Sequence, residues 1–319
     1  ASSPKPTPGM LYEVSSFLGI KEGMANVGEG RNEVLSVDED KFCAAAYNLI
    51  QAYDKIDAGT FFLIVHAAYE IALGSREKKN TAFYHIHNPD DFAIINFLRY
   101  EPTARLVIMV REPLQSCESW LRSTFADNNY KDMVHRIITM LFSLDQVAFR
   151  TQDSIGIRLE DLKNRPEDTM QAFCNWIGVK EAPSLYEMTA QGNKWWGDPA
   201  SPDFNDNEAM PPFGKSSITR AVGTVFDEMD QFVLGTFFYP ISVHFGYREP
   251  DPDGFVEDLK KIRPLLDDML SFEKVMAENP IRVMKPLKAV HPIYGFVQAL
   301  WIAGMCLMNT KTTQTLSIN

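Results

Sequence analysis

The feature that most constrains the fold is a continuous apolar run, LVIMV at residues 106–110, which is followed directly by Arg111, Glu112 and Pro113. An uninterrupted β-branched and apolar run of this kind is typical of a strand buried on both faces of a parallel sheet. Pro113 suits the first turn of a helix, which we expect to extend to Phe125. A second run, SIGIRLEDL at residues 154–162, predicts another central strand.

Helical patterns alternate with these strands. The segment RPEDTMQAFCNWIGV, residues 165–179, begins with a proline and ends at Gly178, as helices often do. Apolar spacing and terminal signals predict further helices at 38–56, 60–73, 90–100, 130–149, 218–237 and 255–270. The alternating run TAFYHIHNP at 81–89 predicts one more strand. The order of strands and helices predicts an α/β fold, with a central parallel sheet flanked by helices.

The length of the chain and the composition of two short segments indicate the domain organisation. A chain of 319 residues is long enough for one large α/β domain with an appendage. Residues 1–10 are rich in proline and serine and are expected to be loose. The segment REPDPDG at 248–254 suggests a boundary. We therefore predict an α/β domain over residues 11–250 and a helical C-terminal extension over residues 251–319.

Charge and cysteine usage narrow the classes of partner and compartment. The net charge of −11 argues against nucleic acid as the main partner, because phosphate backbones require a basic face. An anionic ligand must then be held by a few local basic groups. The four cysteines are scattered, without metal-type spacing, which favours free thiols in the cytoplasm or another reducing compartment.

The most apolar segment spans residues 294–308. Its length of about 15 residues is short of the roughly 20 that a membrane-spanning helix needs. We therefore expect no integral membrane span. A buried helix or a contact surface is the preferred interpretation, and such a surface could support a homo-oligomer or an assembly with another protein.

Arg111 is the first candidate binding residue. Ligands of open parallel sheets lie beyond the carboxyl ends of the strands, where the next helix presents N–H groups. The guanidinium of Arg111 can contact two oxygens of a phosphate there. Ser119, two helical turns further on, could donate to the same anion. The alternative is that Arg111 pairs with a surface carboxylate such as Glu112 or Glu118.

Two histidines form the second candidate. His85 and His87 are two positions apart on the predicted strand, so both point to one face, with His87 near the strand end. A histidine there could take a proton from a hydroxyl nucleophile near neutral pH. The alternatives are a structural histidine or part of a metal pair.

The remaining candidates are weaker motifs. FGKSS at 213–217 ends like a phosphate-binding loop, but Ala209 stands where such a loop needs glycine. Lys215 or Arg220 could still reach an anion from this loop. GEGR at 28–31 lacks the preceding strand and third glycine of a dinucleotide site. The pair at 195–196, both tryptophan, could stack on a purine or simply pack in the interior.

Together, residues 60–247 resemble the sulfotransferase family, enzymes that transfer a sulfuryl group from 3′-phosphoadenylyl sulfate (PAPS). RLVIMVREPLQSCES is similar to that family's 3′-phosphate-binding element, with Arg-x-Pro and a serine eight residues after the arginine. IRLEDLKNRPEDTMQAFCNWIGV is similar to its Glu-Asp-Leu segment, with Leu159 where an aromatic residue is common. FYHIHNP resembles the Lys-Thr-His-Leu-Pro stretch of its cytosolic members.

This resemblance implies residue roles. Arg111 and Ser119 would hold the 3′-phosphate of PAPS or of its product, adenosine 3′,5′-bisphosphate (PAP), and His87 would be the catalytic base. Lys215 and Arg220 are further cofactor-binding candidates, and no metal is expected. The acceptor would be a small or lipid-like hydroxyl compound.

One departure keeps a second function open. The family's Gly- and Ser/Thr-rich loop, which binds the 5′-phosphosulfate, is not found in residues 1–60. The alternative is therefore a catalytically inactive sulfotransferase-like fold that serves as a binding or assembly subunit. A nucleotide kinase of related fold is a third possibility, disfavoured by the missing Walker loop.

Overall fold

The computed structural model describes residues 27–33, 35, 37–75, 79, 81–86, 91–143, 152–198, 204–205, 207–278 and 314–315. The chain divides into two compact units. Unit 1 comprises Ala1–Pro102 and Glu181–Gly214, and unit 2 comprises Thr103–Lys180 and Lys215–Asn319. The predicted division at residues 10 and 250 stays a prediction.

Unit 1 is mostly helical in its described part. Its elements are α2 (Glu39–Gln51), α3 (Ala58–Ala72), α4 (Asp91–Tyr100), the short 3-10 helix η1 (Pro183–Tyr186) and the hairpin strands β3 (Thr189–Ala190) and β4 (Asn193–Lys194). Aspartates cap two of these helices: Asp38 accepts the N–H of Lys41 at 3.0 Å, and Asp57 accepts that of Thr60 at 2.8 Å. The predicted helices at 38–56 and 60–73 are thus confirmed, although the first ends at residue 51.

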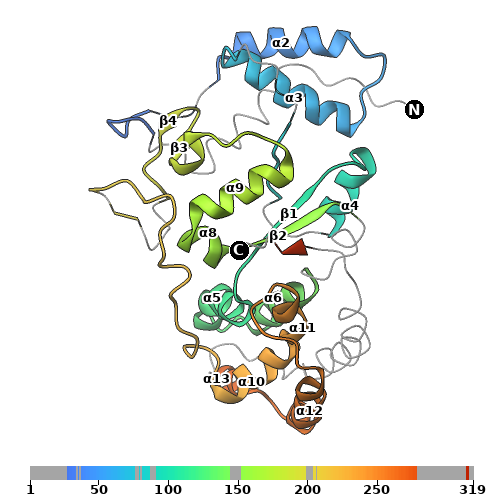
Figure 1. The fold of residues 1–319 in the computed structure, drawn as a ribbon, viewed down its shortest axis with the longest axis vertical. Coiled ribbons are helices and arrows are strands. Elements are labelled where there is room, and N and C mark those ends of the chain that lie inside the picture. Colours follow the sequence, from blue (N-terminus) through green and yellow to red (C-terminus); the bar gives the residue numbers. More distant parts are fainter. Residues whose placement is uncertain are drawn as a thin grey trace. The chain divides into compact units, whose positions relative to one another are not determined.

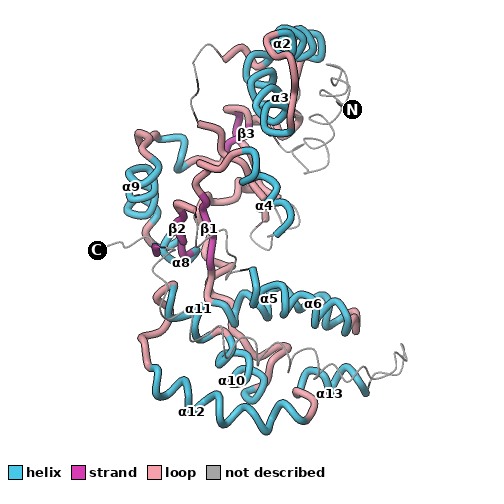
Figure 2. Tube along the Cα trace, turned by 90° about the vertical axis from the view of Figure 1, so that its right-hand side faces the viewer, coloured by secondary structure: helices cyan, strands magenta, loops and turns pink. Residues whose placement is uncertain are grey.

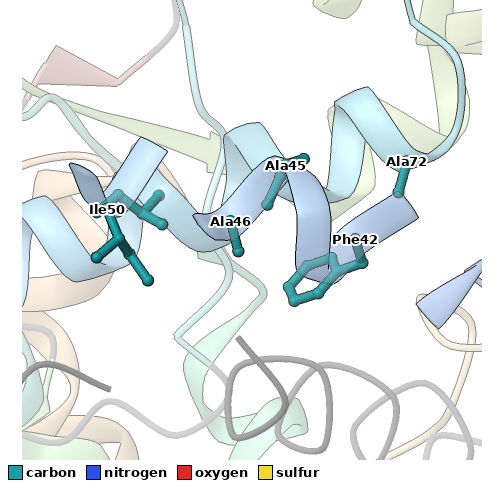
Figure 3. Packing of buried hydrophobic residues seen from close by; sticks show 7 residues of the cluster. Phe42, Ala45, Ala46, Ile50 and Ala72 are labelled. Carbon is teal, nitrogen blue, oxygen red and sulfur yellow. The ribbon is translucent and has the colours of Figure 1, made fainter. Parts of the chain in front are cut away.

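A small apolar cluster joins α2 and α3. Figure 3 shows Phe42, near the start of α2, beside Ala72, at the end of α3, so that the two helices run antiparallel. Alanines at 45, 46 and 68 let the helix backbones approach closely, while Phe42 and Ile50 fill the space between them. This cluster contains the buried apolar side chains of both helices.

The described residues at 81–86 form no strand, so that part of the strand prediction for 81–89 is wrong. The physical reason lies in the aromatic contacts of this segment. The ring of Tyr84 stacks on Phe97 at 5.8 Å and meets Phe62 edge-on at 5.1 Å. The segment is therefore held by side-chain packing on α3 and α4 instead of by backbone pairing with a sheet.

Unit 2 is an α/β unit with a small parallel sheet (Figures 1 and 2). Its strands are β1 (Leu106–Val110), β2 (Ser154–Arg158) and β5 (Gln314–Thr315), all parallel and in the order β1-β2-β5. Its helices are α5 (Pro113–Ala126), α6 (Tyr130–Ser143), α8 (Leu159–Asn164), α9 (Pro166–Ile177), α10 (Glu228–Phe237), α11 (Tyr239–His244), α12 (Pro252–Ile262), the 3-10 helix η2 (Arg263–Asp267) and α13 (Ser271–Glu278). The predicted α/β class and the central parallel pair of strands are therefore confirmed.

The two main strands differ in burial. In β2, all residues from Ser154 to Ile157 are buried, and Gly156 lies directly against the ring of Phe245. In β1, by contrast, the side chain of Met109 is 51% exposed. Burial of β1 on both faces was therefore the wrong expectation: the strand lies at the edge of the described sheet, and its two faces alternate in burial.

Some helix boundaries of unit 2 agree with the sequence signals, and others do not: the predicted helix at 255–270 is instead α12, which ends at Ile262, followed by η2. Gly178 terminates α9 in the left-handed conformation, with φ of 81°, as expected. The predicted helix at 218–237 instead begins only at Glu228. Asp227 caps it by accepting the N–H of Asp230 at 2.9 Å, and Gly223, at φ of 121°, interrupts any earlier helical turn.

The C-terminal helices of unit 2 pack on α10, and side chains fix them there. Asp230, fully buried, accepts the N–H groups of Ser271 at 2.7 Å and Phe272 at 3.0 Å, which caps α13 from a neighbouring helix. Glu273 accepts the hydroxyl of Tyr130 at 2.5 Å. None of the helices in the described ranges is long and apolar enough to cross a bilayer.

Candidate functional site

The candidate site lies where β1 passes into α5 in unit 2. Arg111 and Glu112 form the junction, and Pro113 is the first residue of the helix. The carboxylate of Glu112 caps the helix by accepting the N–H of Gln115 at 2.6 Å. That N–H group is therefore not available to a bound anion, so the helix start presents fewer free donors than expected. Side chains then contribute a larger share of any anion binding here.

Arg111 is partly buried and binds a neutral side chain. Its Nε donates to Gln115 Oε1 at 2.9 Å, and its Nη2 donates to the Gln115 carbonyl at 3.5 Å. Among the described residues it forms no ion pair with a carboxylate, so the alternative partners Glu112 and Glu118 are not observed. Burial, together with the nearby charge of Arg220, lowers the pKa of Arg111.

Ser119 and Arg220 meet beside it. Arg220 Nη1 donates to Ser119 Oγ at 2.9 Å, and Arg220 also lacks an ion-pair partner within the described part of the chain. Gln115 and Ser119 are four residues apart and share one face of α5. We call Arg111, Gln115, Ser119 and Arg220 the arginine cluster. It combines two guanidinium charges with a hydroxyl group.

The loop carrying Arg220 is attached to α5 through backbone contacts. Gln115 Nε2 donates to the carbonyl of Ile218 at 3.4 Å and also to that of Arg220. Arg122 Nη2 donates to the carbonyl of Ala221 at 3.0 Å. Gln115 and Arg122, about two helical turns apart, thus bind three carbonyls of the loop, so the backbone that carries Arg220 is fixed on α5.

Glu118 completes this attachment. Its carboxylate accepts the N–H groups of Gly223 at 2.9 Å, Thr224 at 3.1 Å and Phe226 at 3.0 Å. The Glu118 side chain is only 1% exposed, so it is not the surface carboxylate that the sequence interpretation assumed. Burial opposes its charge, but these backbone donors outweigh burial and lower its pKa. The sequence contains a signal for this burial, because Glu118 lies beside Cys117, Leu121 and Thr124, which form the buried stripe of α5.

Glu160 ties the ends of β1 and β2 together. Its Oε1 accepts the Glu112 N–H at 3.0 Å, and its Oε2 accepts the hydroxyl of Tyr247 at 2.6 Å. Burial and this carboxylate both raise the pKa of Tyr247, so the phenol stays protonated. The bond to Glu112 fixes the backbone directly after Arg111, and the charge of Glu160 favours the protonated guanidinium.

Lys215 lies apart from the cluster. Its carbonyl accepts the N–H of Ile218 at 3.0 Å in a turn, and its side chain is exposed. No described contact joins its Nζ to Arg111, Ser119 or Arg220. Of the four predicted cofactor-binding residues, the structure therefore brings three together and leaves Lys215 outside.

The predicted base is not part of the described site. His87 lies outside the described residues, and His85 is an exposed residue of unit 1. The role of His87 stays a prediction.

In the tryptophan pair of unit 1, the second residue, Trp196, has a packing role. Trp196 Nε1 donates to the carbonyl of Gly28 at 2.7 Å. The guanidinium carbon of Arg31 lies 3.9 Å from the Trp196 ring centre, and Lys194 Nζ lies 4.2 Å from it. Cations of this kind on an aromatic ring stabilise a loop contact. The arrangement favours packing over the alternative of purine stacking for Trp196.

The comparisons with known proteins give no match, so the arginine cluster is the main observation that bears on function. No family model matches the chain, and neither the curated proteins nor the solved structures include a match. In the part of the chain that the structure describes, no three His, Cys, Asp or Glu residues gather into a metal-binding group. The fold and site define an α/β protein with a small parallel sheet and a cationic cluster beyond the end of β1.

Proposed function

We propose that the protein is a sulfotransferase with a sulfotransferase-like α/β fold, which moves a sulfuryl group from PAPS to a hydroxyl acceptor. The observation that carries this proposal is the meeting of Arg111, Ser119 and Arg220 at the end of β1. Two of these residues stand in the Arg-x-Pro and serine pattern that resembles the family's 3′-phosphate site. Arg220, distant in sequence, adds a second charge beside the serine.

The composition of the cluster fits a phosphate monoester. A dianionic phosphate binds best to charged N–H donors that lack a competing carboxylate, and a hydroxyl can add one further hydrogen bond. Arg111 and Arg220 form no ion pair within the described ranges. The carboxylates of Glu160 and Glu112 act on the charge of Arg111 but do not accept its N–H groups, which leaves these donors for a ligand. The mutual repulsion of the two arginines would be relieved by a bound anion.

The proposed chemistry assigns each residue a limited task. PAPS supplies the activated sulfuryl group. The arginine cluster would bind the nucleotide end of this donor and so position it, since transfers of this type depend on positioning and on cationic stabilisation of developing negative charge. His87 would accept the proton of the acceptor hydroxyl. Lys215, five residues before Arg220, is proposed as a further contact to the nucleotide.

The direct test is calorimetric titration of the full chain with adenosine 3′,5′-bisphosphate, compared with adenosine 5′-monophosphate, which lacks the 3′-phosphate. We expect the bisphosphate to bind more tightly. Arg111→Ala and Arg220→Ala should each weaken its binding by about 2 kcal/mol, or roughly 30-fold, because each removes a charge-assisted contact. Arg263→Ala, an exposed arginine of unit 2, is the matched control for net charge. Absence of binding to the wild-type protein would refute the cofactor assignment.

A second candidate function is favoured by one sequence observation, the lack of a Gly- and Ser/Thr-rich phosphosulfate loop in residues 1–60. In this alternative the protein is a catalytically inactive binding or assembly subunit. Transfer of labelled sulfate from PAPS to a panel of phenols, alcohols and sterols distinguishes the two. Bisphosphate binding without transfer to any acceptor would favour the subunit. The apolar segment 294–308, proposed as its contact surface, lies outside the described residues.

A further inference from the structure

A single amide group connects both arginines of the cluster. The oxygen of the Gln115 side chain accepts the Nε–H of Arg111 at 2.9 Å. The nitrogen of the same amide donates to the backbone carbonyl of Arg220, and to that of Ile218 at 3.4 Å. Gln115 therefore contacts the guanidinium of one arginine and the backbone of the other.

The chemistry of the amide suits this position better than that of other side chains. A glutamate would bind Arg111 but repel two carbonyl oxygens and neutralise the guanidinium charge. An apolar residue would leave these donors and acceptors without partners. The neutral amide satisfies both sides and leaves the charge of each arginine available.

The bonding pattern of Arg111 also shows which of its atoms are available. Gln115 accepts from Nε and Nη2, whereas Nη1 has no hydrogen-bond partner among the described residues. The guanidinium is planar, so binding one edge of it fixes the direction of the remaining N–H groups. Arg220 is fixed twice, through its carbonyl by Gln115 and through Nη1 by Ser119.

We infer that Gln115 is a positioning residue, which holds Arg111 and Arg220 in one arrangement for binding a phosphate without reducing their charge. The inference rests on the proposed function only for the identity of the ligand, a nucleotide 3′-phosphate. The hydrogen-bonding role itself does not depend on which ligand binds. Gln115 acts through the arginines and need not touch the ligand.

The first experiment measures this role without ligand. Gln115→Met keeps a side chain of similar length but removes all three hydrogen bonds of the side-chain amide. Gln231→Met is the matched control, because Gln231 Nε2 donates to the Phe226 carbonyl at 2.8 Å, at the other end of the same loop. Proton exchange of the Arg111 Nε–H, followed by nitrogen-15 NMR, should accelerate about tenfold or more in Gln115→Met and stay unchanged in Gln231→Met. Equal exchange rates in Gln115→Met and wild type would overturn the inference.

The second experiment tests coupling to phosphate binding by a double-mutant cycle. Gln115→Met should weaken binding of adenosine 3′,5′-bisphosphate about tenfold in the wild-type background, but less than about twofold when Arg111 is already alanine. Equal losses in both backgrounds would indicate a merely structural role and overturn the inference. If the wild-type protein does not bind the nucleotide, the proposed function fails, while the exchange experiment still decides the positioning role.

A second variant, Gln115→Glu, keeps the inference testable if Gln115→Met does not fold. The carboxylate keeps an acceptor for Arg111, so its Nε–H should stay protected from exchange. Bisphosphate affinity should nevertheless fall more than about tenfold, because the new charge pairs with the guanidinium. Retention of wild-type affinity in Gln115→Glu would contradict the proposed need for a neutral amide.

Discussion

Arg220 donates a hydrogen bond to Ser119 across 101 positions of sequence, at 2.9 Å, and this bond joins the loop before α10 to the middle of α5. Ser119→Ala removes the acceptor and leaves the charge in place. We expect the affinity for adenosine 3′,5′-bisphosphate to fall by about 1 kcal/mol, five- to tenfold, with little change in the free energy of unfolding. Calorimetry and urea denaturation measure the two quantities. Ser123→Ala, at an exposed position of α5, should change neither; an unaltered affinity in Ser119→Ala would count against the shared phosphate site.

The hydrogen bonds of Glu118 to the loop predict that replacing this residue lowers the stability of the protein strongly. Glu118→Ala leaves three N–H groups of the loop without their acceptor, so the free energy of unfolding should fall by about 3 kcal/mol. Urea denaturation at pH 7 checks this value, and Glu257→Ala, at an exposed position of α12, is the control. A loss as small as that of the control would contradict the attachment of the loop by Glu118.

The lowered pKa of Glu118 also gives a pH dependence. Because the folded protein favours the ionised carboxylate, wild type should exceed Glu118→Gln in stability at neutral pH. This difference is present above the carboxyl's ordinary pKa and should shrink as the pH falls through the lowered value. Denaturation of both proteins between pH 3 and pH 7 measures it, and a pH-independent difference would exclude the ionised acceptor.

Asp230 predicts a pH dependence of the opposite sign. Burial, assisted by the neighbouring Asp227, raises its pKa from 3.8 to about 6. The folded state thus binds the proton more tightly, and the stability that this provides is lost as the pH rises through about 6. Relative to Asp230→Asn, wild-type stability should fall by up to about 3 kcal/mol between pH 4 and pH 7.

Asp227 supplies the internal control for this measurement. Its pKa is lowered, chiefly by the N–H of Asp230 that it accepts as helix cap. Relative to Asp227→Asn, wild-type stability should therefore rise as the pH increases toward and through 3.8, and change little between pH 4 and pH 7. Urea denaturation of the wild type and of the two asparagine variants between pH 3 and pH 7 measures both pH dependences. Curves that run in the same direction would show that the burial of Asp230 does not control its protonation.

Gly156 predicts a steric effect in the sheet. A Cβ at this position would overlap the Phe245 ring, which is only 1% exposed. Gly156→Ala should therefore lower the free energy of unfolding by about 2–3 kcal/mol. Adding Phe245→Leu should restore part of the loss, and thermal melts of the single and double variants measure this. Strictly additive losses would mean that the two residues do not share this space.

Regular elements of unit 2 were predictable because their signals are local. Pro113 at the start of α5 and Gly178 at the end of α9 mark helix ends within a few residues. The exposure of Met109 was not predictable from its strand, since an apolar run does not reveal how many strands and helices cover it. Burial depends on neighbours that are distant in sequence.

The site was predictable in part for the same reason. Arg111 and Ser119 share one strand–helix junction, so their spacing alone suggested that they act together. Arg220 was a weaker candidate because its approach depends on tertiary contacts of Gln115 and Glu118 with the loop. Those contacts also explain the wrong helix start at residue 218: N–H groups that would have entered a helix are bound by a carboxylate on α5.

This attachment changes how the segment between Arg220 and Glu228 should respond to changes in length. Surface loops generally tolerate insertions and deletions, because their backbone is not committed to partners. Here Ala221, Gly223, Thr224 and Phe226 each bind a side chain of α5 through their backbone. One added residue would shift every later contact out of register, so this irregular segment has the fixed length of a core element.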